Sequence, residues 1–212
     1  MRIGIFGGTF DPIHIGHLRA ALEIAEELEL GKVYMVPSAL PPHKTRTPTT
    51  LFFHRLEMVK LAVVTSDSLG YLDLEGKRSG PSYSIDTLRE LYKIFGKKTE
   101  FFFIIGLDAF LEIKTWKEYE NLFEYANFVV IGRSNHKKED FVAFISGLQI
   151  SVMGETDSNV FTLPSKKKMM FKKTTRMDIS ATSIRKKVGK GRSIDFLVPD
   201  SVNKYIREKE LY

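Results

Sequence analysis

The sequence has 212 residues, of which 43% are hydrophobic and 27% are charged, and it contains no cysteine. This composition is ordinary for a globular domain, and it excludes a disulfide scaffold and cysteine-based zinc sites. The longest apolar runs are far shorter than a membrane span, and the first residues show no signal-peptide pattern. We therefore expect a cytoplasmic protein with no membrane partner.

The net charge of +6 is unevenly placed. Residues 163–192 hold eleven Lys or Arg residues against one acid, Asp178. This segment predicts an anionic partner, such as nucleotide phosphates or nucleic acid, or else a solvated loop. Phe171 is the one aromatic residue within it, whereas nucleic-acid-binding surfaces interleave aromatic and basic residues. A nucleic-acid-binding module thus remains the alternative of a different class, and we expect no nucleic-acid partner.

The hydrophobic pattern predicts strands that alternate with helices along most of the chain. Short apolar runs predict strands at 2–6, 32–37, 71–74, 100–105, 127–132, 149–153 and 169–176. Apolar residues at helical spacing predict helices at 16–30, 50–65, 84–95, 109–113, 118–123, 140–146, 180–188 and 199–209. The expected fold class is therefore α/β, a Rossmann-like doubly wound parallel sheet with a small helical part at 178–212. We expect 1–212 to form a single domain.

The turn between the first strand and the first helix is rich in glycine and carries two histidines. Residues 7–17 read GGTFDPIHIGH. A strand that enters a helix through paired glycines leaves backbone N–H groups at the helix amino terminus, which is a ready anion site. Neither a Walker A sequence nor the GxGxxG dinucleotide sequence occurs there. The turn therefore predicts a phosphate site of another kind.

Three other segments are expected at the same edge of the sheet, beyond the carboxyl ends of the strands. A proline-rich loop at 38–48 carries Lys44, and Ser180 is expected to cap a helix that carries Arg185 one turn further in. The turn at 106–108 follows a buried strand, and Asp108 is either a helix cap or an acceptor for ribose hydroxyls. Ser84 is the expected cap of the helix at 84–95.

This set of residues fits phosphoryl or nucleotidyl transfer, which needs in-line geometry and groups that stabilise negative charge. Two histidines alone are too few for zinc, so we predict no metal ligand set on the protein. No nucleophile-elbow sequence is present, which argues against a serine hydrolase.

These motifs resemble a known family. Residues 7–17 resemble the HxGH signature of the nucleotidylyltransferase superfamily, and ISATSIR at 179–185 resembles its second motif, ISxxxxR. PHK at 42–44, SYSIDTL at 82–88, and GLD at 106–108 followed by Trp116 are similar to bacterial nicotinate-nucleotide adenylyltransferases. The resemblance covers roughly the whole chain, with two departures. GRS at 132–134 stands where the family has Arg-Pro, and 159–173 is longer and more basic than expected.

The resemblance implies that the protein transfers the adenylyl group of ATP to nicotinate mononucleotide, which gives deamido-NAD and pyrophosphate in NAD biosynthesis. Mg²⁺ is expected to accompany ATP. The resemblance implies catalytic roles for His14, His17 and Arg185. It assigns ATP binding to Gly7, Gly8, Thr9, Phe10, His14, His17, Gly106, Asp108, Ile179, Ser180 and Arg185. It assigns nicotinate mononucleotide binding to Lys44, Ser84, Thr87, Trp116 and Lys117.

Within the second group, Trp116 is expected to stack on the pyridine ring. Backbone N–H groups near Thr87 and at 116–117 are expected to meet the nicotinate carboxylate. The alternatives within the superfamily are adenylyltransferases for nicotinamide mononucleotide or for phosphopantetheine. The segment 159–173 has three open interpretations, which are added phosphate attraction, an oligomer contact and a solvated hairpin. Whether the chain forms a homo-oligomer is left open as well.

Overall fold

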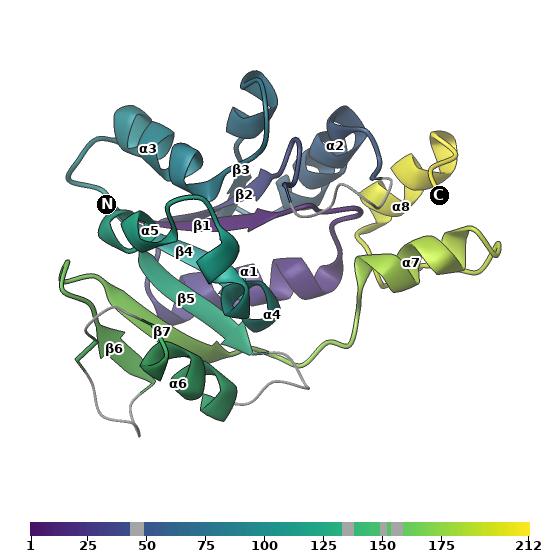
Figure 1. The fold of residues 1–212 in the computed structure, drawn as a ribbon. Coiled ribbons are helices and arrows are strands. Elements are labelled where there is room, and N and C mark those ends of the chain that lie inside the picture. The colour runs from purple at the N-terminus through teal and green to yellow at the C-terminus, as the bar shows by residue number, and fades with distance from the viewer. Residues whose placement is uncertain (43–48, 133–137, 149–151, 154–158) are drawn as a thin grey trace.

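The computed structural model describes residues 1–42, 49–132, 138–148, 152–153 and 159–212. Within them, seven strands form one sheet in the order β3-β2-β1-β4-β5-β7-β6 (Figure 1). All neighbouring strands are parallel except β6, which is antiparallel to β7. The strands are β1 (Arg2–Gly8), β2 (Lys32–Pro37), β3 (Leu69–Tyr71), β4 (Glu100–Gly106), β5 (Asn127–Gly132), β6 (Val160–Thr162) and β7 (Lys168–Lys173).

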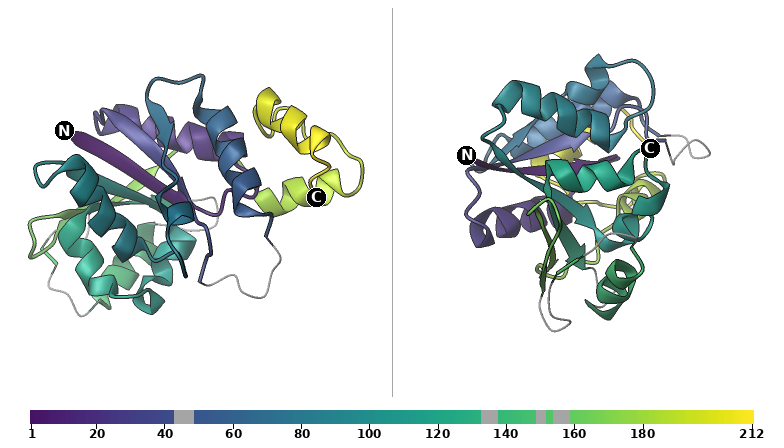
Figure 2. Two further views of the ribbon diagram at one scale, coloured as in Figure 1. Left: turned by 90° about the horizontal axis from the view of Figure 1, so that it is seen from above. Right: turned by 60° about the vertical axis from the view of Figure 1, so that its left-hand side comes forward.

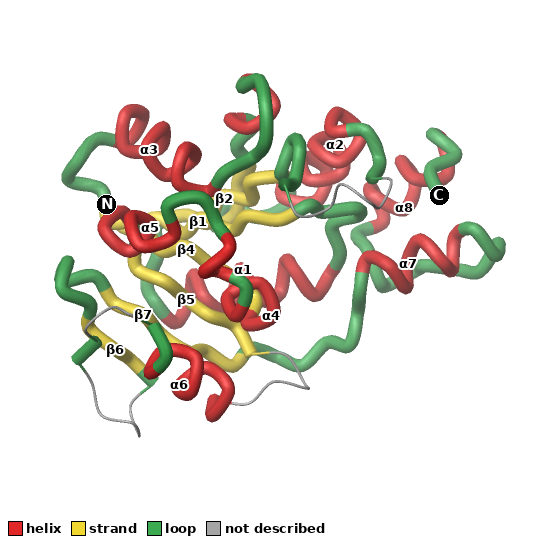
Figure 3. The backbone as a smooth tube through the Cα atoms, viewed as in Figure 1, coloured by secondary structure: helices red, strands yellow, loops and turns green. Residues whose placement is uncertain are grey.

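Helices cover both faces of this sheet, as the red and yellow segments of Figure 3 show. One face packs against α1 (Ile15–Glu27), α2 (Phe52–Val63), α7 (Ala181–Val188) and α8 (Asp200–Glu208). The other packs against α3 (Ser84–Phe95), α4 (Leu107–Leu111), α5 (Tyr119–Tyr125) and α6 (Lys138–Ser146). Each face has its own buried apolar cluster. The expected doubly wound α/β fold is thus confirmed.

The β6–β7 hairpin explains part of the basic segment. Strand β7 lies beside β5, and its central residues Met169, Met170 and Phe171 are buried. Lysines flank this short apolar run on both sides, and the strand predicted at 169–176 is found at Lys168–Lys173. The segment is therefore part of the sheet and of its core, and the interpretation as a merely solvated hairpin is wrong.

One predicted strand is displaced. The strand expected at 71–74 lies at Leu69–Tyr71, where Leu69 is buried beside Val33 of β2. The residues that follow form a 3-10 helix, Leu74–Lys77, because Leu74 and Glu75 turn inward there. Part of the strand expected at 149–153 lies outside the described residues, and Met153 forms an isolated bridge with Thr162.

Candidate active site

The site lies where the strand order reverses, between the neighbouring strands β1 and β4. In an open α/β sheet the connections diverge at this point and leave a crevice beyond the carboxyl ends of the strands. A cavity of about 1160 Å³ occupies this crevice. Of the residues predicted for the site, its lining includes Gly7, Gly8, Thr9, Phe10, His14, His17, Ser84, Thr87, Gly106, Asp108, Trp116, Lys117, Ile179 and Ser180.

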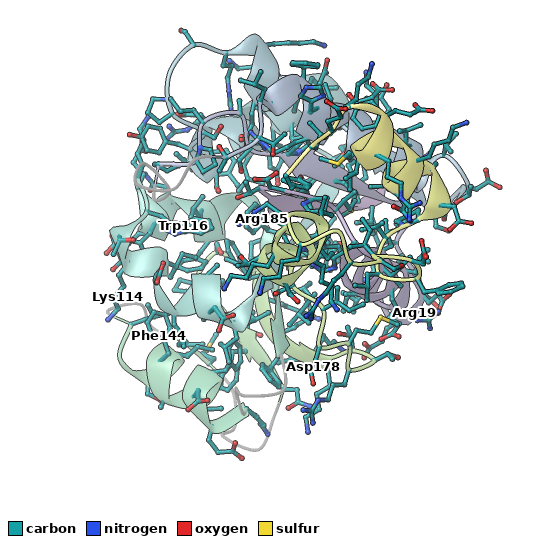
Figure 4. All side chains as sticks on the ribbon, turned by 90° about the vertical axis from the view of Figure 1, so that its right-hand side faces the viewer. Arg19, Lys114, Trp116, Phe144, Asp178 and Arg185 are labelled. Carbon is teal, nitrogen blue, oxygen red and sulfur yellow. The ribbon has the colours of Figure 1, made fainter. Side chains whose placement is uncertain are left out.

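Two predicted residues stand apart from that group. Lys44 lies outside the described residues, together with 133–134 of the turn where the sequence departs from the family. Arg185 is half-buried on α7 and is not among the residues that line the cavity in the described chain. In Figure 4, Trp116 and Arg185 come from different parts of the chain, Trp116 from the segment between α4 and α5 and Arg185 from α7.

The glycine turn leads directly to the two histidines. A β-carbon at Gly8 would lie 2.9 Å from the ring of Phe10, so a larger residue there would displace that ring. Phe10 has a left-handed backbone, with φ of 49°, and its ring and that of His17 form a T-shaped pair with centroids 5.1 Å apart. The rings of His14 and His17 are stacked, with centroids 3.6 Å apart.

A hydrogen bond determines the tautomer of His17. The amide N–H of His14 donates to His17 Nδ1 at 3.3 Å, so a neutral His17 ring carries its proton on Nε2. His14 is the cap residue of α1, which begins at Ile15, within one residue of the predicted start near Gly16. The pair thus lies at a helix amino terminus, where negative charge is favoured.

Buried Arg55 joins this turn to the loop after β2. Its guanidinium donates to the carbonyl oxygens of Thr9 and Ser38, both at 2.7 Å, and to those of Ala39 and Thr50. Arg55 is 1% exposed, and burial lowers the pKa of its guanidinium. The sequence did not identify this residue, because an arginine within an amphipathic helix is typical of a solvent-facing position.

Asp11 is a second buried group at this end of the cavity. Its carboxylate accepts from the hydroxyl of Tyr212 at 2.7 Å and from the amide N–H of Thr50 at 3.2 Å. Its backbone carbonyl accepts from Nη1 of Arg185 at 2.6 Å. Residues distant in sequence therefore converge on the turn, and no local pattern predicts this convergence.

The second helix start matches its prediction. Ser180 caps α7, and its Oγ accepts from the amide N–H of Ser183 at 3.2 Å. The segment before it lines the cavity with Lys173 and Arg176. This segment is attached to α1, because the amide N–H of Thr175 donates to Glu23 at 2.7 Å. Part of the basic segment therefore faces the cavity.

The opposite end of the cavity contains the aromatic residue. Trp116 is half-buried and meets the ring of Phe103 edge-on, with centroids 6.4 Å apart. Lys117 forms an ion pair with Asp86 at 3.0 Å, and its ammonium lies 4.8 Å from the ring centre of Tyr83. Tyr83 is also the cap residue of α3, so the expectation that Ser84 is the cap is wrong by one position.

The hydroxyl of Thr87 is hydrogen-bonded to neighbouring side chains. It is 2% exposed, and its hydroxyl donates to Glu75 Oε1 at 2.7 Å and accepts from Arg78 Nη2 at 2.6 Å. Burial raises the pKa of the Glu75 carboxyl. Glu75 lines the cavity as well, and no sequence pattern identified it.

The expected donors for a nicotinate carboxylate are partly engaged within the protein. The amide N–H of Thr87 donates to the carbonyl of Tyr83 at 3.2 Å, and that of Trp116 donates to Ile113 at 2.9 Å. Both bonds belong to helical turns, which the expectation did not take into account. These two amides are therefore engaged within the protein, and the wider expectation of backbone donors near Thr87 and at 116–117 stays a prediction.

Asp108 lies at the carboxyl end of β4. It is exposed in the first turn of α4, whose cap residue is Gly106, so the interpretation of Asp108 as the cap is wrong. It lines the cavity, and its role as an acceptor for ribose hydroxyls stays a prediction.

The sheet is doubly wound, and the cavity at the point where the strand order reverses lies beside the starts of two helices, α1 and α7. These features are those of a Rossmann-like nucleotide-binding protein. Comparison with known proteins narrows this class. The chain belongs to the cytidylyltransferase-like family, whose sequence profile matches residues 5–187.

Two curated relatives are similar over their whole length. The chain is 46% identical to a protein of Desulfatibacillum aliphaticivorans, with 100% of both chains covered. It is 40% identical to a protein of Geotalea uraniireducens, with 100% of this chain and 98% of the relative covered. Both relatives are named probable nicotinate-nucleotide adenylyltransferase, so the family resemblance of the sequence motifs is confirmed.

Solved structures share the fold. The nicotinic acid mononucleotide adenylyltransferase of Plasmodium falciparum, complexed with NaAD, superposes with a TM-score of 0.76 at 22% identity, over 100% of this chain and 97% of that one. Its complex with APC gives a TM-score of 0.74. Within the described residues, no helix has the length and apolar character that a bilayer crossing needs.

Proposed function

We propose that this protein transfers the adenylyl group of ATP to nicotinate mononucleotide and so produces nicotinate adenine dinucleotide (deamido-NAD) and pyrophosphate. The observation that carries the proposal is one continuous cavity with two different ends. The phosphate end, defined by residues 7–17 and 179–180, has two helix starts. The ring end, defined by residues 82–87 and 116–117, has an aromatic side chain beside a helix start. Two nucleotides can meet in such a cavity with their phosphates together.

The reaction needs no covalent intermediate on the protein. A phosphate oxygen of nicotinate mononucleotide forms a bond to the α-phosphorus of ATP. The bond from that phosphorus to the oxygen that bridges to the β-phosphate breaks, and pyrophosphate leaves with the electron pair. The work left to the protein is alignment and stabilisation of negative charge.

His17 meets this need through its hydrogen bonding. Because Nδ1 is occupied by the amide N–H of His14, Nε2 is the nitrogen that donates to a phosphate oxygen. Its ring is fixed between His14 and Phe10, so the donor needs little rearrangement as charge develops. The start of α7, with Ser180 and the charge of Arg185, serves the leaving pyrophosphate.

Magnesium enters this proposal as part of the substrate, bound to the phosphates of ATP. In the described residues no three His, Asp or Glu side chains are grouped to hold a metal ion. The phosphates themselves supply the oxygen ligands that Mg²⁺ prefers. We further assign the reaction to the cytoplasm. The chain has no cysteine and so does not depend on the disulfide bonds that form in oxidising compartments.

Two features of the ring end favour nicotinate over nicotinamide. The amino terminus of α3 lies at Ser84 in the cavity lining, and Lys117 lines the same end. A helix amino terminus and an ammonium group both favour a negative substituent, which nicotinate has and nicotinamide lacks. Trp116 contributes a flat apolar surface for the ring of either compound.

Substrate choice tests the proposal. Purified protein with ATP and magnesium should release pyrophosphate much faster with nicotinate mononucleotide than with nicotinamide mononucleotide or phosphopantetheine. Equal rates with the two pyridine mononucleotides would remove the nicotinate assignment. Pyrophosphate release with phosphopantetheine alone would instead indicate a phosphopantetheine adenylyltransferase.

A further inference from the structure

The carboxyl-terminal part of the chain contacts the phosphate turn, residues 7–17, at three points. Arg185 donates to the carbonyl of Asp11 at 2.6 Å, and the carbonyl of Leu197 accepts from the amide N–H of Ile15 at 3.0 Å. Tyr212 donates its hydroxyl to Asp11 Oδ1 at 2.7 Å. Figures 1 and 2 show the carboxyl end beside α7, on the side of the molecule where α2 and α8 lie.

The bond from Tyr212 differs from the other two because its acceptor is a buried carboxylate. Asp11 is 4% exposed, and its other oxygen accepts from the amide N–H of Thr50 at 3.2 Å. A buried carboxylate oxygen that loses its donor is left without a hydrogen bond and moves toward water, so each donor helps to fix its position. Burial and the nearby Asp11 raise the pKa of the Tyr212 hydroxyl, which therefore keeps its proton at neutral pH.

The position of Asp11 matters for the residues on either side of it. Phe10, which precedes it, has the left-handed backbone that turns its ring toward His17. His14 follows three residues later and caps α1. A shift of Asp11 thus changes the turn amides and both histidines together. Tyr212 itself is not among the cavity-lining residues of the described chain, so it acts through Asp11.

We propose that Tyr212 is a positioning residue for ATP, which fixes the phosphate turn through its hydrogen bond to the buried carboxylate of Asp11. The inference rests on the proposed function for the identity of the substrates. It predicts that loss of the hydroxyl weakens the use of ATP and spares the ring end, where the pyridine mononucleotide binds. A purely structural role would reduce stability without distinguishing the two substrates.

The test is Tyr212→Phe, which removes one oxygen atom and leaves the ring. The chain offers a matched control, Tyr205→Phe. Tyr205 lies on α8, and its hydroxyl is hydrogen-bonded to Nδ1 of His54 on α2 at 2.8 Å. Neither residue is among those that line the cavity in the described chain. For each variant we would measure kcat/KM for ATP, KM for nicotinate mononucleotide, Tm, and the affinity for a non-hydrolysable ATP analogue by calorimetry.

We expect Tyr212→Phe to lower kcat/KM for ATP about 10-fold, as loss of a hydrogen bond to a charged group does. Affinity for the analogue should fall in parallel, while KM for nicotinate mononucleotide changes less than about twofold. Tyr205→Phe should leave all three quantities at the wild-type values. The inference is overturned if Tyr212→Phe keeps wild-type ATP kinetics, or if both substrates are affected equally.

These measurements distinguish a failure of the proposed function from a failure of the role of Tyr212. If the wild-type protein made no dinucleotide from nicotinate mononucleotide, the proposed function would be wrong. The affinity for the ATP analogue would still decide whether Tyr212 positions the phosphate turn. If the wild-type protein is active and Tyr212→Phe matches the control in every measurement, only the positioning role is lost.

Discussion

The two ends of the cavity are built differently. At the phosphate end, buried groups from distant segments fix the turn: Arg55 holds the carbonyls of Thr9 and Ser38, and Tyr212 holds Asp11. Around the ring end, the ion pairs are partly exposed. The side chains of Lys117 and Asp86 are 41% and 33% exposed, and those of Arg89 and Glu118 are 37% and 35% exposed.

This difference follows from what each end has to do. Groups that stabilise a charged transition state contribute most when they are already in place, because no reorganisation is then needed during the reaction. Exposed ion pairs are weak and salt-screened, so they can adjust as a ligand enters. The phosphate end is therefore preorganised for chemistry, and the ring end is suited to choosing the partner. The variants below test that division, from the largest expected effect to the smallest.

Arg55→Met should have the largest effect. The substitution keeps a long side chain but leaves the carbonyls of Thr9, Ser38, Ala39 and Thr50 without their donor. Buried acceptors without partners are costly, so we expect the free energy of unfolding to fall by about 3 kcal/mol or more. Denaturant titration measures the change.

Arg55→Lys is the companion variant, in case Arg55→Met does not fold. Lysine keeps the positive charge but lacks the planar fork that reaches several carbonyls at once. It should recover part of the stability and little of the ATP kinetics. Full stability and full activity in Arg55→Lys would contradict the idea that the fork organises the phosphate end.

His17→Ala comes next. Removal of the Nε2 donor should lower kcat on the order of 10²-fold, as loss of an oxyanion-stabilising donor does, with a small change in KM for ATP. Steady-state pyrophosphate release measures both constants. If KM alone rose, His17 would bind the ground state, and its assigned role in the transition state would be wrong.

Glu75→Gln should have a smaller effect that depends on pH. Burial raises the pKa of Glu75 in the folded protein, so the folded state binds its proton more tightly than the unfolded state does. Its stabilising contribution is complete below the ordinary pKa of a glutamate and is lost as pH rises through the raised value.

The measurement for Glu75 is the free energy of unfolding from about pH 5 to about pH 8, in the wild type and in Glu75→Gln. The wild type should lose stability relative to the variant as pH rises, because glutamine can still accept from Thr87 but does not ionise. Parallel curves would show that Glu75 does not titrate with the predicted shift.

Lys117→Met should have the smallest effect on stability. Its ion pair with Asp86 is exposed, and such pairs contribute about 0–1 kcal/mol. We expect Tm to stay nearly unchanged, KM for nicotinate mononucleotide to rise about threefold, and KM for ATP to stay the same. A large loss of stability would contradict the weak contribution assigned to this exposed ion pair.

The sequence predicted the local parts of the site well. The glycine turn, the cap at Ser180 and the strands Lys32–Pro37 and Asn127–Gly132 follow from short-range patterns, and the structure has them in place. Glu75 and the bond between Asp11 and Tyr212 were not predictable in this way. Such contacts join positions that are remote in sequence, and a buried charged residue has the same sequence pattern as an exposed one.

The most direct test of the central claim separates chemistry from partner choice. The measurement is kcat/KM for nicotinate and for nicotinamide mononucleotide, in the wild type, His17→Ala and Trp116→Ala. We predict that the wild type strongly prefers nicotinate mononucleotide, that His17→Ala lowers both values by the same factor, and that Trp116→Ala raises KM for the mononucleotides with little change in turnover at saturation. A changed preference in His17→Ala, or a loss of turnover without a change in KM in Trp116→Ala, would contradict the division between the two ends.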